Sequence, residues 1–314
     1  MADPIIEVEG VSMRFGEVLA LDEVSLEVPA GTVLGLLGHN GAGKTTLIDI
    51  LSTLRPPTAG TARIAGFDVV RRSREVSSRI GLTGQFASVD EQLSGIENLV
   101  LIARLLGAGK REARERADEL LSLFDLSEAA GRPARTYSGG MRRRLDLAAG
   151  MVGHPDVIFL DEPTTGLDPV SRMGLWSIVE SLVVDGTTVL LTTQYLDEAD
   201  RLADSITVLS AGRVVASGTS AELKAQVGQR TVTARLAEPA DADRASRALS
   251  GAGFHPAHDA ERGAFTIPVG ASRELAGVVR ALDEAGVEVG DLGLGEPTLD
   301  DVYLSLAHPA PTTA

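Results

Sequence analysis

Apolar and polar residues alternate along the first 35 residues of the chain, in the segments IIEVEGVSMRF, VSLEV and TVLGLL. A period of two predicts β-strands, and the intervening Gly and Pro residues predict the turns between them. From Lys44 the segment KTTLIDILSTL changes to the period of a helix. Residues 96–125 show the same helical spacing, with Arg and Glu pairs on the outer face. The start of the chain is therefore predicted to consist of strands that lead into helices.

The middle of the chain alternates between strand and helix patterns, in the order VIFLDEP, WSIVESLVV, TTVLLTT and YLDEADRLAD. This order predicts a mostly parallel sheet covered by helices, which is an α/β fold.

After about Leu223 the pattern becomes that of a smaller unit. The segments RTVTARLA, GAFTIPV and VEVGDLGL are predicted to be strands, and ADRASRALSGAG and SRELAGVVRALDEAG to be helices. We therefore expect a first domain over residues 5–222, a small α+β domain over 223–307 and a disordered tail over 308–314. Within this part, FHPAHDA contains His255 and His258, but Pro256 and the lack of a second ligand cluster favour a surface hairpin loop over a metal site.

Composition narrows the classes of partner. The 314 residues carry a formal net charge of −15 and the sequence pI is about 4.8. Such an acidic chain repels nucleic acid, so we expect no nucleic-acid partner. The chain has no Cys, which excludes thiolate chemistry. The start MADPIIEVEG does not resemble a signal region, and no apolar run approaches the roughly 20 residues of a membrane helix. We expect a cytoplasmic protein that reaches the membrane only through a partner.

A glycine-rich loop is the first element with a defined chemistry. Residues Gly38 to Thr45, GHNGAGKT, match the phosphate-loop pattern G-x-x-x-x-G-K-[ST]. The glycines let backbone N–H groups approach phosphate oxygens, and the following helix adds its N-terminal dipole. Lys44 is placed to contact the β- and γ-phosphates, and the Thr45 hydroxyl is placed to bind Mg²⁺.

The loop alone leaves several classes of nucleotide-binding protein open. A GTPase needs an N-K-x-D motif, and none of Lys44, Lys110 and Lys224, the lysines of the chain, lies in one. A small-molecule kinase would have an Arg-rich lid and a shorter chain.

Two further motifs follow in the same domain. The strand VIFL ends in Asp161-Glu162, which places one carboxylate to hold Mg²⁺ and the next to deprotonate an attacking water. Ser138-Gly139-Gly140 precedes a helical pattern and predicts a second helix N-terminus suited to phosphate. A second phosphate-binding terminus would serve a nucleotide held by another subunit.

Taken together, the phosphate loop, YSGGM, VIFLDEP, TGLD and TTQYLDEAD resemble the ATP-binding subunits of ABC transporters over residues 5–220. YSGGM differs from the commoner LSGGQ at its first and last positions and keeps the Ser-Gly-Gly core. Gln194 and the ending EPTLDDVYLSLAH are similar to the daunorubicin/doxorubicin-resistance branch of exporters. The resemblance implies a P-loop NTPase domain with a helical subdomain at about residues 86–145.

The resemblance also assigns residues. Phe15 matches an aromatic that stacks on adenine, Gln85 matches a glutamine that reaches Mg²⁺ and the attacking water, and Asp168 matches a contact to the opposite subunit. The alternatives are a core ring for Phe15, a turn residue for Gln85 and a turn-initiating aspartate for Asp168. The implied nucleotide-binding residues are Phe15, Gly38, His39, Asn40, Gly41, Ala42, Gly43, Lys44, Thr45, Thr46, Gln85, Ser138, Gly139, Gly140 and Asp168. The implied Mg²⁺ ligands are Thr45, Gln85 and Asp161, and the implied catalytic residues are Lys44, Glu162 and Gln194.

Gln194 occupies the place where the family usually has His. Its amide is also a hydrogen-bond donor, but it does not titrate near neutral pH as His does. We expect the contact to the γ-phosphate to persist without pH sensitivity; the alternative is that Gln194 contacts nothing and hydrolysis is weak.

The resemblance implies an ATPase that powers export of a drug, antibiotic or lipid-like compound. Two copies would enclose two ATP molecules head to tail, and the segment from Phe86 to Asn98 would contact a separately encoded membrane permease at the cytoplasmic face of the membrane. The alternatives are an ABC ATPase that acts on nucleic acid or ribosomes and a regulatory subunit that does not hydrolyse ATP. Acidity and a single phosphate loop argue against the first, and Glu162 argues against the second.

Overall fold

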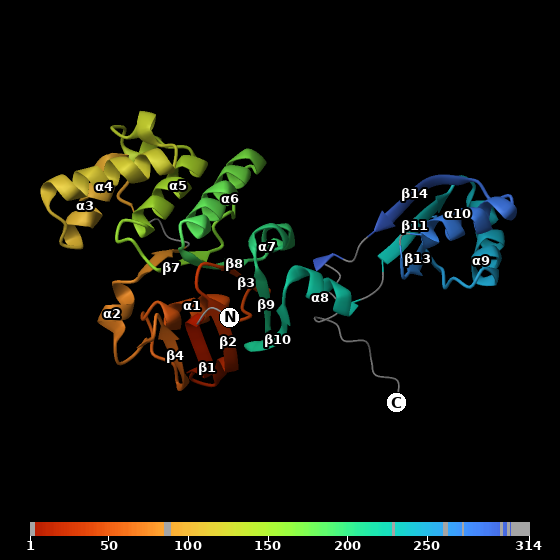
Figure 1. Ribbon diagram of the computed structural model, residues 1–314, viewed down its shortest axis with the longest axis horizontal. Coiled ribbons are helices and arrows are strands. Elements are labelled where there is room, and N and C mark those ends of the chain that lie inside the picture. The colour runs from red at the N-terminus through yellow and green to blue at the C-terminus, as the bar shows by residue number, and fades with distance from the viewer. Residues whose placement is uncertain are drawn as a thin grey trace. The chain divides into compact units, whose positions relative to one another are not determined.

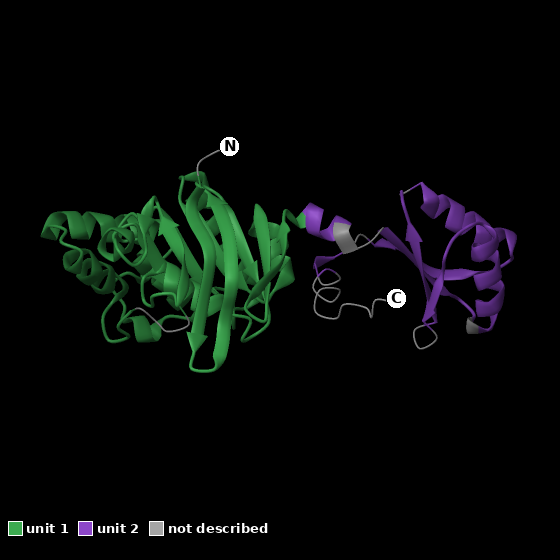
Figure 2. Ribbon diagram, turned by 90° about the horizontal axis from the view of Figure 1, so that it is seen from below, with its two compact units in different colours: residues 1–220 green, residues 221–314 purple. Residues whose placement is uncertain are grey.

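The computed structural model describes residues 4–84, 89–227, 230–259, 263–271, 273–295, 298, 299 and 302. The chain forms two compact units, Met1–Ser220 and Ala221–Ala314, which Figure 2 shows in green and purple. The predicted tail at 308–314 lies outside the described residues.

Unit 1 begins with a small antiparallel sheet in the order β2-β1-β4-β5. Its strands are β1 (Pro4–Phe15), β2 (Val18–Pro29), β4 (Ala59–Ile64) and β5 (Phe67–Asp68). The predicted alternation holds because apolar residues of β1 such as Ile6, Val8 and Val11 are buried and their neighbours are more exposed.

The second sheet of unit 1 has the order β10-β9-β3-β8-β7-β6 and is parallel except for β10. Its strands are β3 (Val33–Leu37), β6 (Ile80–Thr83), β7 (Val157–Asp161), β8 (Thr188–Thr193), β9 (Ser205–Ser210) and β10 (Arg213–Gly218). The helices between these strands are α1 (Lys44–Leu51), α2 (Ser73–Ser77), α6 (Pro169–Val184) and α7 (Leu196–Leu202). Every residue of β3, β7 and β8 is buried, as expected for central parallel strands covered on both faces.

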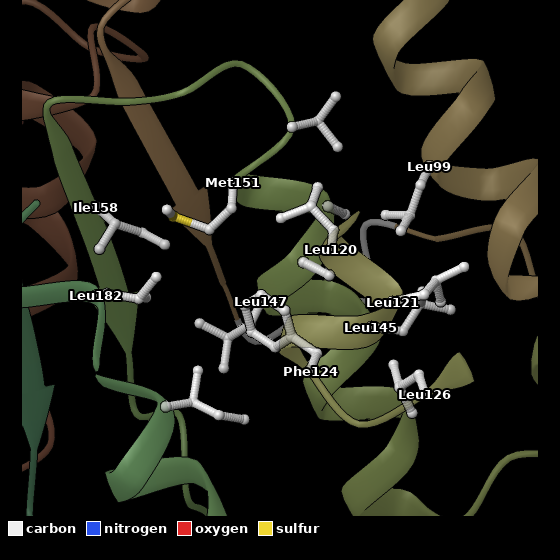
Figure 3. Packing of buried hydrophobic residues seen from close by; sticks show 14 of the residues in the cluster. Leu99, Leu120, Leu121, Phe124, Leu126, Leu145, Leu147, Met151, Ile158 and Leu182 are labelled. Carbon is white, nitrogen blue, oxygen red and sulfur yellow. The ribbon is translucent and has the colours of Figure 1, made fainter. Parts of the chain in front are cut away.

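Three helices between β6 and β7 form the helical part of unit 1 (Figure 1). They are α3 (Gly95–Leu105), α4 (Lys110–Leu123) and α5 (Gly139–Gly150). Ser94 caps α3 in a capping box with Glu97, which satisfies backbone N–H groups of the first turn. Leucines of these helices pack in one cluster with Ile158 of β7 and Leu182 of α6 (Figure 3). The helical part therefore shares a core with the sheet that carries the phosphate loop.

The described residues of unit 2 form a four-stranded antiparallel sheet in the order β12-β13-β11-β14 together with three α-helices. Its elements are α8 (Ser220–Val227), β11 (Arg230–Leu236), α9 (Ala242–Gly251), β12 (Ala257–Asp259), β13 (Ala264–Val269), α10 (Glu274–Glu284) and β14 (Val289–Gly295). Val232 and Ala234 of β11 and Phe265 of β13 pack against apolar residues of α9 and α10. The short strand β12 falls where the sequence predicted a hairpin loop, and His258 stacks on Phe265 there with ring centroids 4.6 Å apart.

Within the part of the chain that the structure describes, no helix combines the length and apolar character needed to cross a bilayer.

Candidate functional site

Three strand ends bring the predicted site residues of unit 1 together. β3 and β7 both pair with β8 in parallel, with Leu37 opposite Thr193 and Asp161 opposite Thr192. The phosphate loop, Glu162 and Gln194 directly follow these three strands, so they lie at one edge of the sheet (Figure 1). The carboxyl edge of a parallel sheet is where ligands bind in this type of fold.

The phosphate loop has backbone geometry that requires glycine. Gly43 has φ +108°, and a Cβ there would lie 2.7 Å from the carbonyl oxygen of Ala20. A Cβ at Gly38 would lie 2.5 Å from the carbonyl oxygen of Leu209. Both contacts are with backbone atoms that have no side-chain freedom to relieve them. The loop is thus held close to β2 and β9 at its two ends.

Lys44 is a buried cation, with a side chain only 5% exposed. Its Nζ donates to the carbonyl oxygens of Gly38 (2.7 Å) and His39 (3.3 Å) and lies 3.8 Å from Oε1 of Glu162. Desolvation lowers the pKa of Lys44, and the nearby carboxylates of Glu162 and Asp161 oppose that effect. The ammonium group is therefore positioned by backbone carbonyls of the same loop that is expected to surround phosphate.

Asp161 is buried at the end of β7 between two hydroxyl donors. Thr45 Oγ1 donates to Oδ2 at 3.2 Å, and Thr192 Oγ1 donates to Oδ1 at 2.5 Å. Thr45 and Asp161 thus present a hydroxyl and a carboxylate oxygen at one point, and hard oxygen donors of this kind fit Mg²⁺. The described residues contain no group of three or more His, Cys, Asp or Glu side chains that could hold a metal.

Glu162 adopts an unusual backbone conformation, with φ +48°. Its N–H donates to Thr192 Oγ1 at 3.0 Å, and Thr165 Oγ1 donates to its Oε2 at 3.4 Å. The left-handed region costs a non-glycine residue about 1–3 kcal/mol, and such strain concentrates at functional sites. In this conformation the Glu162 carboxylate lies beside Lys44.

The Ser-Gly-Gly segment and Asp168 lie against one another. Ser138 caps α5, and its Oγ accepts from the Met141 N–H. A Cβ at Gly140 would lie 2.5 Å from Oγ of Ser171, and that hydroxyl donates to Asp168 Oδ2 at 2.6 Å. These hydrogen bonds lower the pKa of Asp168, chiefly through Ser171. Asp168 is therefore the N-cap of α6, and it adjoins the N-terminus of α5.

Of the remaining predicted residues, Phe15 and Gln194 lie at the surface of unit 1, and Gln85 lies outside the described residues. Phe15, at the end of β1, is 40% exposed, and the Arg55 guanidinium lies 5.0 Å from its ring centroid. Gln194 is exposed directly after β8. Gln85 lies outside the described residues, as do 86–88. His39, Asn40, Ala42 and Thr46 belong to the loop and the first turn of α1.

Sequence reasoning missed the role of Arg143. Arg142 pairs with Glu91 at 2.9 Å, and Arg144 pairs with Asp125 at 3.4 Å. The Arg143 guanidinium instead donates to the carbonyl oxygens of Pro163 (2.8 Å), Gly84 (2.9 Å) and Asp161 (3.1 Å). Burial lowers its pKa. The only sequence signal was its position in the helix after the Ser-Gly-Gly segment.

Glu198 is a second residue that sequence reasoning missed. This carboxyl of α7 is fully buried, and Trp176 Nε1 of α6 donates to its Oε1 at 3.1 Å. Burial raises the pKa of Glu198. The pair links α6, which begins after Asp168, to α7, which begins after Gln194. Sequence spacing places Glu198 on the first turn of α7 but does not reveal its partner.

The loop between β3 and α1 leads into a lysine and a threonine, and two acidic residues from the end of β7 lie beside them. This arrangement defines a phosphate-loop NTPase. A family model described as ABC transporter matches residues 21–165. The daunorubicin resistance ATP-binding protein DrrA3 of Streptomyces coeruleorubidus is 53% identical over 307 residues, which cover 98% of this chain and 96% of that protein. The doxorubicin resistance ATP-binding protein DrrA of Mycobacterium tuberculosis is 47% identical, covering 97% and 94%. The chain belongs to the ABC transporter family, as an ATP-binding subunit.

Solved structures agree with this family. The cbiO1 structure from Clostridium perfringens, part of the ABC transporter complex cbiONQ, has a TM-score of 0.67 at 25% identity and covers 71% of this chain and 92% of its own. The dimeric post-hydrolysis state of the ATP-binding cassette MJ0796 bound to ADP and Pi has a TM-score of 0.62 at 25% identity, covering 68% and 98%. The predicted family, fold class and ATPase class are confirmed.

Proposed function

We propose that this ABC ATPase powers export of a drug, antibiotic or lipid-like compound through a separate membrane permease. The observation that carries the ATPase part is the contact of Lys44, Asp161, Glu162 and Thr45 at one sheet edge. The similarity to the daunorubicin and doxorubicin resistance proteins over nearly the whole chain supports the class of cargo.

The phosphate loop would bind the triphosphate through its N–H groups and Lys44. On arrival of the γ-phosphate, the Lys44 ammonium would exchange its carbonyl contacts with Gly38 and His39 for phosphate oxygens. Thr45 and Asp161, with Gln85, would hold Mg²⁺, which would neutralise phosphate charge. Phe15 would stack on adenine.

Glu162 would accept the proton of the attacking water, because its carboxylate lies at the strand end beside Lys44. Gln194 would donate its amide N–H to the γ-phosphate from the end of β8. We expect Gln194→Ala to lower ATPase activity about tenfold, the effect of one lost donor, and an unchanged rate would contradict this contact. Gln194→His should introduce a pH dependence near the imidazole pKa that the native glutamine lacks.

Two copies would enclose two ATP molecules, each between the phosphate loop of one copy and Ser138-Gly139-Gly140 of the other. The adjacency of the α5 N-terminus and Asp168 supports this arrangement, because both would face the second copy together. Loss of the γ-phosphate would remove shared contacts and open the pair. The permease would contact the segment 86–98 at the cytoplasmic face of the membrane, where the chain would be peripheral.

The decisive experiment on the site uses Glu162→Gln, which keeps the shape and removes the base. We expect hydrolysis to fall at least about 100-fold, and ATP with Mg²⁺ to trap a dimer measured by light scattering. Glu284→Gln, an exposed change in unit 2, should match the wild type. A Glu162→Gln protein that hydrolyses ATP normally, or that stays monomeric with ATP and its permease, would contradict the mechanism.

The cargo requires a separate experiment. Co-expression with a candidate membrane permease from the same genome should lower accumulation of an anthracycline in a sensitive host, and Glu162→Gln should abolish that effect. The alternative is an ABC ATPase that acts on nucleic acid or ribosomes. Stimulation of the ATPase by nucleic acid or ribosomes, and not by the permease in vesicles, would favour that alternative.

A further inference from the structure

β14 forms one edge of the sheet in unit 2. Among the described residues it pairs only with β11, so backbone N–H and C=O groups along its other side point away from the sheet. The opposite edge, β12, has three residues, whereas β14 has seven. β14 is therefore the edge that is long enough to receive another strand.

Residues 291–295 of β14, within the strand sequence VGDLGLG, lack the lysine, proline and bulges that usually protect an edge strand. The strand contains no Lys, Arg or Pro, and Asp291 is its one charged residue. Its pairing with β11 is irregular only at Gly290, between the pairs Arg235–Asp291 and Leu236–Val289. Residues 291–295 are regular. Natural edges are commonly protected by lysine, proline or bulges, so an unprotected stretch of this length indicates a pairing partner.

The leucines of β14 lie on the face that carries the core of unit 2. Leu292 is opposite Ala234 and Leu294 is opposite Val232, and both partners are fully buried against α9 and α10. Leu292 packs on that core, while Leu294 is 37% exposed. The apolar surface of the core thus continues onto the unpaired edge strand.

The other face of β14 carries small residues. Asp291, Gly293 and Gly295 lie opposite Arg235, Thr233 and Thr231. Asp291 is exposed, and neither glycine adds a side chain. The stretch DLGLG therefore alternates leucine on one face with glycine or aspartate on the other.

We propose that β14 pairs antiparallel with β14 of a second copy of this chain, about a two-fold axis at Gly293. In this register each Leu292 faces Leu294 of the other copy on the core side, which extends both cores across the junction. Asp291 faces Gly295, so the two carboxylates do not oppose each other. Two sheets of four strands become one continuous sheet.

Neighbouring registers fit less well. Centring the axis on Asp291 would place two carboxylates directly opposite, which is unfavourable. Centring it on Leu292 would bring the irregular Gly290 into the pairing. The register at Gly293 is the one that uses only the regular residues 291–295 and avoids like charges.

This contact is independent of nucleotide and distinct from the ATP-dependent pairing of unit 1. Copies joined through unit 2 would stay together after ATP is hydrolysed, which raises the effective concentration of one ATPase unit for the other. Rejoining on new ATP would then not depend on diffusion from solution.

In the proposed dimer, Gly293 of one copy lies directly opposite Gly293 of the other copy, and the test uses this pair. A Cβ at this position meets nothing within 4 Å, and its φ is not in the left-handed region, so an isolated unit 2 accepts a side chain there. Gly293→Asp alone and Gly293→Lys alone each place like charges opposite one another in the dimer. An equimolar mixture of the two variants places unlike charges opposite one another.

The measurement is the molar mass of the nucleotide-free full chain by sedimentation equilibrium. We expect the wild type to be dimeric, each variant monomeric, and the mixture dimeric again. The control is Thr266→Asp, which adds the same charge in the same cross-strand row, through Thr233, but on β13; it should stay dimeric.

Three outcomes would overturn the proposal. They are a monomeric wild type without nucleotide, a mixture that stays monomeric, and a Gly293→Lys protein that dimerises by itself. None of them bears on the ATP-dependent pairing of unit 1, which is measured by adding ATP and Mg²⁺ to Glu162→Gln in a Gly293→Lys background, where the contact between the two copies of unit 2 is absent.

Discussion

The two units differ in what their sheets bury. In the described residues, every buried polar or charged side chain belongs to unit 1, including Lys44, Asp161 and Glu198. Unit 2 buries an apolar core that includes Phe265, and its other sheet face bears Thr, Gly and Pro together with the exposed residues Arg235 and Asp291. Burying charge is costly unless it is paired or used, and in the described residues this cost falls only in unit 1, which carries the predicted site.

Phe265→Ala tests whether unit 2 takes part directly in the ATPase reaction. Loss of this fully buried ring should lower the free energy of unfolding of unit 2 by about 3–5 kcal/mol, measured as its own denaturant transition. The affinity of unit 1 for a fluorescent ATP analogue should stay within about two-fold, because the two units have separate hydrophobic cores. Phe265→Leu should cause a smaller loss of stability. A joint loss of stability and nucleotide affinity would show that the units are not separable.

Lys44→Met tests the buried charge of unit 1. The change keeps the buried stem and removes the ammonium group, so ATP affinity should weaken about 100-fold, the loss expected for charge-assisted bonds to phosphate. Titration with the fluorescent analogue measures this effect. Lys110→Met, the same change at an exposed position, should bind normally, and normal binding by Lys44→Met would contradict the site.

Thr192→Val tests the role of the Thr192 hydroxyl, which contacts both Asp161 and Glu162. The variant removes the donor to Asp161 Oδ1 and the acceptor of the Glu162 N–H. We expect unit 1 to lose about 1–2 kcal/mol of stability, because buried polar atoms lose partners, and ATPase activity to fall. Thr192→Ser keeps the hydroxyl and should retain most of the activity. If the valine variant hydrolyses ATP as fast as the serine variant, the hydroxyl does not position the carboxylates.

Glu198→Gln should give the smallest effect, one that depends on pH. Burial raises the folded-state pKa of Glu198 above its ordinary value of 4.5. The folded state therefore binds the proton more tightly than the unfolded state, and the wild type loses stability from this group as pH rises from 4.5 through the raised pKa. The variant lacks this loss, so its melting temperature relative to the wild type should increase over that window. A difference that is flat with pH would show that Glu198 titrates normally.

The sequence allowed the site to be predicted wherever chemistry depends on consecutive residues. The phosphate loop, Asp161-Glu162 and the N-cap at Ser138 are local patterns, and each lies at the predicted strand end or helix start. The mostly parallel sheet was predicted from the alternation of strand and helix patterns in the middle of the chain, and its central strands β3, β7 and β8 are fully buried.

Contacts between distant segments could not be predicted in this way. Arg143 reaches carbonyl groups up to 59 residues away, and Trp176 finds Glu198 on another helix. Neither residue has a local pattern that distinguishes it from a surface arginine or a core tryptophan. The short strand β12 was missed because only tertiary pairing with β13 makes it a strand.

Through Arg143, helix α5 contacts two separate loops. One guanidinium holds the carbonyl groups of Gly84, just before Gln85, and of Asp161 and Pro163 on either side of Glu162. A displacement of α5 would therefore move the backbone at Gly84 and the backbone around Glu162 together. Lysine, with a single ammonium group, could not hold three carbonyl groups in the same fixed plane.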